Sequence, residues 1–390
     1  MSRILLSMSR STCERYKVGV QKAPAPLPRG DANKKCVGGQ TNVRSSTGAK
    51  RGIHLVGSVG LSDASTVFET VAKILGGNCL RIPDGETGDR GYWIRWQLHS
   101  FQNNPLLELQ NVTRALPGFE DSLERKFFRI KDGANPKDIT FGDLGYAKSA
   151  KESFRTFSKL KRQGTIAKEV KFLVALPTPV ALLCGFIVFE DREHVEESLT
   201  AAVLQELRKI QNAIPHDQLS IQWDVCYEIV GIDGGPPLHF IDPIDGSAER
   251  IAALCAAVDA EVDVGLHICY GDPGHRHIVE PNSLESAVAL INRVFSRVCR
   301  QIDFVHVPVP RSRDDDEYFC PLKALHMGEY TRLILGIVHS TDGIEGGMRR
   351  IRTASRFWSD FDIATECGFG RRDAQTIPDL LRLHKELCSI

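Results

Sequence analysis

The chain has 390 residues, of which 42% are hydrophobic and 25% are charged, the balance of an ordinary soluble globular protein. Lysine plus arginine and aspartate plus glutamate both total 49, so no net positive field favours nucleic acid or an anionic membrane as a partner. The most apolar stretch, FLVALPTPVALLCGFIVF, contains two prolines and is too broken for a transmembrane helix. Eleven cysteines without regular spacing indicate a reducing compartment, where thiols can act as metal ligands.

Residues 1–52 differ in composition from the rest of the chain. They contain eleven Lys and Arg against only Glu14 and Asp31, and they show no sustained hydrophobic period. Such a segment cannot bury enough apolar surface to offset the entropy lost on ordering, so we expect a disordered basic N-terminal tail. We expect the protein to be cytoplasmic. A mitochondrial transit peptide is the alternative interpretation of the tail, although its APAPLPRG stretch breaks helices.

Eight short apolar runs, rich in β-branched residues and bounded by turn residues, predict strands in the remainder of the chain. They span residues 53–60, 78–85, 171–176, 219–225, 262–269, 302–309, 332–339 and 360–367. Amphipathic helical patterns lie between most of them. The clearest are residues 283–298, with apolar side chains on one face, and residues 192–210, acidic at the start and basic at the end.

The alternation of strand and helix predicts an α/β protein, a (β/α)8 TIM barrel formed by residues 53–390 as a single domain. A doubly wound sheet is the alternative, but no Gly-x-Gly-x-x-Gly turn follows any of the predicted strands. The segment between the second and third strands is too long for one crossover. We therefore expect an insertion at about 95–168, with its own helices, after strand two.

In such barrels the active site lies at the carboxyl ends of the strands, so the polar residues that end each run are candidates for function. They are Ser58, Asp84, Glu86, Thr178, Asp224 followed by Glu228, His267, Cys269, Arg311, His339, Glu366 and Cys367. The convergence of so many reactive side chains on predicted strand ends indicates a catalytic site, whereas no single motif would.

Three of these residues predict a metal site. His267 and Cys269 are two apart in a strand, so both side chains can point to the same face. Cys367 at the end of strand eight can supply a third ligand across the barrel mouth. A His/Cys/Cys set suits zinc and leaves a fourth position for water or substrate. Bound zinc would hold a substrate thiol as the more nucleophilic thiolate.

The segments HIC at 267–269 and ECGFGRR at 366–372 resemble the zinc-binding segments of the C-terminal barrel of cobalamin-independent methionine synthase. That barrel shares a superfamily with uroporphyrinogen decarboxylase. Further stretches resemble its strand ends, namely VGSVG, DGETGDRG, LPTPVALL, IQWDV and IVHS. The resemblance covers most of the chain from Ile53 onward.

The resemblance implies a substrate and a cofactor. Ser58, Glu86 and Asp224 would hold an amino-acid-like substrate, and the His/Cys/Cys set would bind zinc. The implied partners are a small-molecule thiol or amino-acid-like substrate and an alkyl donor.

The resemblance and the strand ends also suggest catalytic groups. His339 would be the general acid that assists departure of the alkyl donor, and we assign Asp224 to catalysis as well as to binding. We also assign Glu228 and Arg311 to substrate binding. An arginine at this position can bind a substrate carboxylate through two parallel hydrogen bonds.

The chain departs from the methionine synthase pattern at several points. The strand-six glutamate that binds zinc in that family falls at Pro308, and the glutamate after the strand-four aspartate falls at Val225. The chain is also about half the length of the two-barrel enzymes. We therefore expect a zinc-dependent methyl or alkyl transferase that acts on a different thiol or alkyl donor. The alternatives are a metal-free barrel enzyme of the decarboxylase type and a catalytically silent small-molecule binder.

Overall fold

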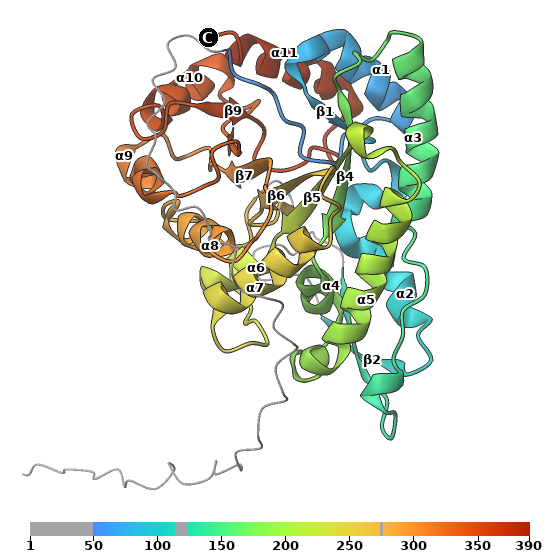
Figure 1. Ribbon diagram of the computed structural model, residues 1–390. Coiled ribbons are helices and arrows are strands. Elements are labelled where there is room, and N and C mark those ends of the chain that lie inside the picture. Colours follow the sequence, from blue (N-terminus) through green and yellow to red (C-terminus); the bar gives the residue numbers. More distant parts are fainter. Residues whose placement is uncertain (1–49, 114–123, 274–275) are drawn as a thin grey trace, which may run out of the picture. The chain divides into compact units, whose positions relative to one another are not determined.

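The structure, a computed structural model, describes residues 50–113, 124–273 and 276–390, so nearly all of the predicted tail lies outside the described residues. Its core is a curled parallel sheet of seven strands in the order β1-β4-β5-β6-β7-β8-β9, with helices around it (Figure 1). The strands are β1 Arg81–Pro83, β4 Lys171–Pro177, β5 Leu219–Val225, β6 Asp263–Ile268, β7 Phe304–Pro308, β8 Arg332–Gly336 and β9 Phe361–Ile363. Seven of the predicted strands therefore form, and the α/β class is confirmed.

The first predicted strand contributes isolated bridges instead of a full strand. Ile53 makes one parallel bridge to Cys79, just before β1, and another to Ile363 in β9. The amide of His54 donates to the carbonyl of Ile363 at 2.9 Å. Because this segment pairs with both edges of the curled sheet, the arrangement is compatible with a TIM-barrel-like fold.

The helices follow the strands in the predicted alternation. The principal ones are α1 Ala64–Leu75, α3 Tyr146–Arg162, α4 Pro179–Phe186, α5 Arg192–Gln211, α6 Tyr227–Ile232, α7 Pro243–Ala256, α8 Glu285–Phe295, α10 Gly343–Ala354 and α11 Ile377–Leu387. The two helices with the clearest sequence patterns form as α5 and α8. Across the described ranges, no helix has both the length and the apolar composition that a membrane span requires.

The interior of the curled sheet changes in polarity along its axis. At the amino ends of the strands, Asp263 forms ion pairs with Arg81 at 3.1 Å and with Lys171 at 2.7 Å. An apolar cluster packs inside, made of Val56, Leu173, Phe304, Ile334 and Ala364. Four polar side chains are also buried, namely His54, Gln222, His267 and His306. The strand register places Gln222, His267 and His306 nearer the carboxyl ends of the strands than Leu173 and Phe304. The interior therefore changes from apolar to polar toward the carboxyl ends.

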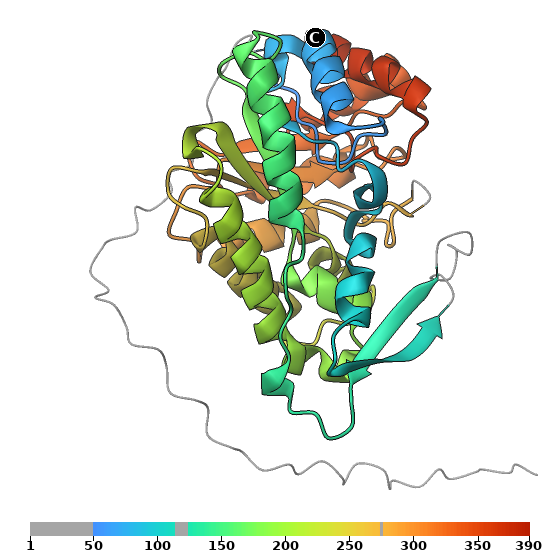
Figure 2. The ribbon, with the colours of Figure 1, turned by 90° about the vertical axis from the view of Figure 1, so that its right-hand side faces the viewer.

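The segment between β1 and β4 contains strands as well as helices. It includes a kinked 3-10 segment, η2 Gly88–Gln97, then α2 Leu98–Gln102 and the antiparallel pair β2 Leu107–Thr113 and β3 Arg125–Ile130. This hairpin, which the sequence patterns did not predict, projects from the main sheet (Figure 2). In contrast, α3 contacts α1, α5 and β4, the position of a helix that connects neighbouring barrel strands.

Candidate metal centre and its pocket

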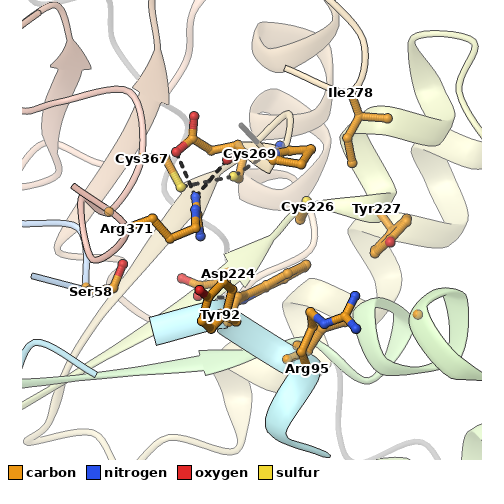
Figure 3. A pocket seen from close by; sticks show the side chains of 18 of the residues that line it. Ser58, Tyr92, Arg95, Asp224, Cys226, Tyr227, Cys269, Ile278, Cys367 and Arg371 are labelled. Atoms are coloured by element: carbon orange, nitrogen blue, oxygen red, sulfur yellow. Dashed lines mark hydrogen bonds and ion pairs between the residues drawn. The ribbon is translucent and has the colours of Figure 1, made fainter. Parts of the chain in front are cut away.

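A cavity of about 270 Å³ lies at the carboxyl ends of the strands (Figure 3). Six of the predicted site residues line this cavity, namely Ser58, Glu86, Asp224, His267, Cys269 and Cys367. They come from the segment before α1, the loop after β1, β5, β6 with its carboxyl end, and the loop after β9. The fold therefore gathers side chains from nearly the whole length of the described chain.

His267, Cys269 and Cys367 form a group with the donor chemistry of a metal site. Their ligand atoms all lie within 4.8 Å of one another, and the two sulfurs are 3.7 Å apart. Tetrahedral zinc with Zn–S bonds of about 2.3 Å places two thiolate sulfurs about 3.8 Å apart. The sulfur spacing therefore fits two ligands of one zinc ion.

Hydrogen bonds fix the tautomer of His267. His306 Nε2 lies 3.0 Å from the carbonyl oxygen of Thr365, which can only accept, so Nε2 carries the proton. Burial lowers the pKa of His306 to about 3, and the neutral ring therefore accepts a hydrogen bond at Nδ1. His267 Nδ1 lies 2.7 Å from that atom and donates to it. This leaves a lone pair on His267 Nε2, a buried atom without a hydrogen-bond partner in the described ranges.

The space around this histidine pair depends on a glycine. A Cβ at Gly336 of β8 would lie 3.0 Å from His306 Nε2 and 3.0 Å from the carbonyl oxygen of Thr365. A larger residue would push the imidazole away from its acceptor. The orientation of His267 is therefore set by its surroundings, as is usual for metal-binding histidines.

The two thiols need a nearby positive charge to ionise. The hydrogen bond with Cys226 and burial raise the pKa of Cys269, and the hydrogen bond with Cys269 and burial raise the pKa of Cys367. The amide of Gly271 donates to Cys269 Sγ at 3.3 Å, and the Arg371 guanidinium lies beside the same pair (Figure 3). Two neighbouring cysteine sulfurs and an imidazole are a donor set that suits zinc.

Two carboxyl groups also line the cavity and interact with each other. Asp224 accepts hydrogen bonds from Trp93 Nε1 at 3.2 Å and from Gln222 Nε2 at 3.0 Å. Burial raises the pKa of Asp224 to about 7. Burial and the nearby charge of Asp224 together raise the pKa of Glu86 to about 8. The two groups therefore titrate as a pair near neutral pH, and a ligand ammonium group would favour their ionised forms.

The backbone holds Glu86 and Ser58 at the cavity. Glu86 has a φ of 44°, in the left-handed region that costs a non-glycine residue free energy. A Cβ at Gly57 would lie 3.4 Å from Glu86 Oε1, so the carboxyl group packs directly against this glycine. Ser58 Oγ accepts a hydrogen bond from the amide of Gly370 at 3.2 Å. Ser58 is thereby tied to the loop that carries Cys367.

Three other predicted site residues do not line the cavity. His339 is buried, with Nε2 donating to the carbonyl of Val309 at 2.9 Å and Nδ1 at 3.5 Å from Glu366. Glu228 is fully buried on α6, where burial raises its pKa to about 7. Arg311 lies exposed beyond β7. The structure thus places these three apart from the cavity, and their assigned roles stay predictions.

Several lining residues were not among the predicted ones. They include Trp93, Arg95, Arg125, Cys226, Tyr227 and Arg371. Arg371 lies within the ECGFGRR stretch, a signal that could have identified it. Cys226 has the apolar neighbours in sequence that are typical of a packing thiol. The others belong to η2, β3 or α6, and no motif marks them.

Comparison with known proteins supports the fold. The sequence matches no protein-family model and no curated protein. A structure named for a vitamin-B12-independent methionine synthase of Listeria monocytogenes is 16% identical, with 83% of this chain and 86% of that chain covered at a TM-score of 0.50. A B12-independent methionine synthase from Shewanella sp. W3-18-1, solved with selenomethionine, is 14% identical, with 87% and 97% covered at a TM-score of 0.56. At these identities the likeness establishes a shared fold.

Proposed function

We propose that the protein is a zinc-dependent transferase that moves a methyl or other alkyl group to a thiol. The observation that carries the proposal is the convergence of the ligand atoms of His267, Cys269 and Cys367 within 4.8 Å. Zinc bound there would supply the positive charge that keeps a substrate thiol ionised near neutral pH. His306 keeps the imidazole in the tautomer that this role requires.

The other polar residues of the cavity would bind and orient the substrate. The paired carboxyls of Glu86 and Asp224 would accept hydrogen bonds from an ammonium group, and Trp93 holds Asp224 in place. Ser58 would donate its hydroxyl hydrogen to a substrate carboxylate, since its oxygen already accepts from Gly370. Holding the substrate at several points near the sulfurs lowers the entropic barrier to transfer.

The structural neighbours agree with this substrate class. Both are named as methionine synthases, and one was solved with selenomethionine, an amino acid that carries an alkylated selenium.

Pro308, where methionine synthases have a glutamate ligand, ends β7 with no donor atom in its side chain. We therefore propose a thiol or alkyl donor other than those of methionine synthesis.

Metal analysis of purified protein tests the proposal. We expect close to one zinc per chain in the unmodified protein and a large loss in Cys367→Ser. Cys320→Ser is the matched control, because Cys320 is an exposed thiol outside the cavity, and its loss should leave the zinc content unchanged. Loss of zinc should also abolish alkylation of thiols.

Other outcomes would select the alternatives. Full alkyl-transfer activity in zinc-free protein would contradict the proposal. Turnover of polycarboxylates that chelators do not affect would support the metal-free decarboxylase type. Zinc and thiol binding with no turnover across a broad panel of alkyl donors would indicate a silent binder.

A further inference from the structure

The carboxyl group of Asp224 is held by donors on two different elements. Its Oδ2 accepts a hydrogen bond from Trp93 Nε1 of η2 at 3.2 Å, and its Oδ1 accepts one from Gln222 Nε2 at 3.0 Å. Gln222 lies two residues before Asp224 in β5, so both side chains point to the same face of the strand. Gln222 therefore reaches Asp224 from the interior of the curled sheet, where it is buried.

Hydrogen bonds fix the orientation of the Gln222 amide. Its nitrogen also donates to the carbonyl oxygen of Val56 at 2.6 Å, and a carbonyl oxygen can only accept. Both hydrogens of the amide nitrogen are therefore in use, one on Val56 and one on Asp224. The amide oxygen must face the other way, and His54 Nε2 lies 2.9 Å from it.

His54 supports this amide. Because the oxygen of Gln222 can only accept, His54 Nε2 carries a proton and donates it to that hydrogen bond. Burial lowers the pKa of His54 to about 3, so the ring is neutral and its proton is on Nε2 alone. Donors therefore run in one direction from His54 through Gln222 to Asp224. We call His54 and Gln222 the interior pair.

The interior pair limits how Asp224 can meet a ligand. Asp224 lines the cavity, whereas His54 and Gln222 are buried outside its lining. A carboxylate oxygen has two lone pairs, and one on each oxygen of Asp224 is already used by Gln222 or Trp93. A ligand N–H group therefore meets a carboxyl group whose direction is set beforehand, which lowers the entropy lost on binding.

We propose that Gln222 and His54 are positioning residues that aim the carboxyl group of Asp224 at a substrate ammonium group and so set a preference for aminothiols over plain thiols. The inference rests on the proposed function, in which Glu86 and Asp224 accept hydrogen bonds from that ammonium group. It adds residues that touch no ligand, and it assigns part of the substrate selectivity to the interior of the sheet.

Paired probes with and without an amine test the inference on zinc-loaded protein, with affinities measured by calorimetry. The pairs are L-homocysteine with 4-mercaptobutyrate and L-cysteine with 3-mercaptopropionate, and the members of each pair differ only in the amine. We expect the amines to bind about ten-fold more tightly, the gain typical of hydrogen bonds to a charged group. Gln222→Leu should remove most of this preference and leave the binding of the mercaptoacids unchanged.

Two substitutions at His54 separate orientation from packing. His54→Leu removes the donor to Gln222 and should lower the preference for amines by about three-fold, the effect of one ordinary hydrogen bond. His54→Gln places an amide nitrogen where the imidazole Nε2 lies, so it should keep the preference. The two variants decide the inference even if Gln222→Leu does not fold.

His384→Leu is the matched control. His384 is also a buried histidine, with Nδ1 2.7 Å from the carbonyl oxygen of Leu380 in α11, and it lies outside the cavity lining. We expect this variant to keep the preference for amines. Because the preference compares two probes on the same protein, a general loss of stability or of zinc affects both probes alike.

Three results would overturn the inference: equal binding of amines and mercaptoacids to the unmodified protein, an unchanged preference in Gln222→Leu, or equal losses in His54→Leu and His54→Gln. The S-methyl ethers L-methionine and 4-(methylthio)butyrate separate it from the proposed zinc chemistry. Equal binding of L-homocysteine and L-methionine would contradict zinc activation of the thiol. A preference for the amine that persists between the two ethers and requires Gln222 would still support the interior pair.

Discussion

Replacing His306 with leucine would remove the acceptor that holds the Nδ1 proton of His267. The two Nδ1 atoms are 2.7 Å apart in a buried setting, so the substitution leaves a buried N–H group unpaired at a cost of about 1–3 kcal/mol. If the unpaired N–H group destabilises the zinc-bound protein and not the zinc-free protein, zinc affinity falls by about 10–100-fold. A loss of this size is usual when a metal-binding histidine loses its hydrogen-bond partner. Competition with a chelator of known affinity measures this change.

His306→Asn is the matched control. The amide oxygen of asparagine can occupy the position of the imidazole Nδ1 and accept the same hydrogen bond. We expect this variant to keep most of the zinc affinity, whereas both variants lose the bond to the carbonyl of Thr365. Equal loss in both variants would mean that packing, and not the acceptor, orients His267.

The tautomers can also be observed in zinc-free protein. Nitrogen-15 NMR should find the proton of His267 on Nδ1 and that of His306 on Nε2, because the carbonyl of Thr365 can only accept. A proton on His267 Nε2 would refute the reasoning, since that nitrogen would have no lone pair for a metal. This measurement does not depend on whether zinc binds.

Two further predictions concern stability. Burial raises the pKa of Asp224 in the folded protein to about 7, so the folded state binds this proton more tightly than the unfolded state and loses stability as pH rises toward 7. Asp224→Asn should therefore gain more in melting temperature over the unmodified protein at pH 8 than at pH 5, and an equal change at both would contradict the assigned pKa. Gly265→Ala would place a Cβ in the space of the Phe304 ring and should cost about 1–3 kcal/mol in urea unfolding. Gly142→Ala, which meets nothing within 4 Å, should cost far less, and similar losses in both would argue against close packing inside the sheet.

The sequence alone determined the strands and the residues at their ends. Alternation in a strand repeats every two residues, so the pattern that buries Leu266 and Ile268 also directs His267 and Cys269 to the opposite face. The same local rule located Asp224 at the end of β5. These predictions needed only neighbouring residues, which is why seven strands formed where the patterns indicated.

The tertiary structure decided which of those strand ends meet. Cys367 reaches Cys269 across 98 residues of sequence, and His306 reaches His267 across 39, because the sheet curls until distant strands share one interior. His339, in contrast, lies 3.5 Å from Glu366 and does not line the cavity. Likewise, no local period could reveal that β3 contributes Arg125 to the cavity, because that contact depends on where an inserted hairpin packs and not on its own sequence pattern.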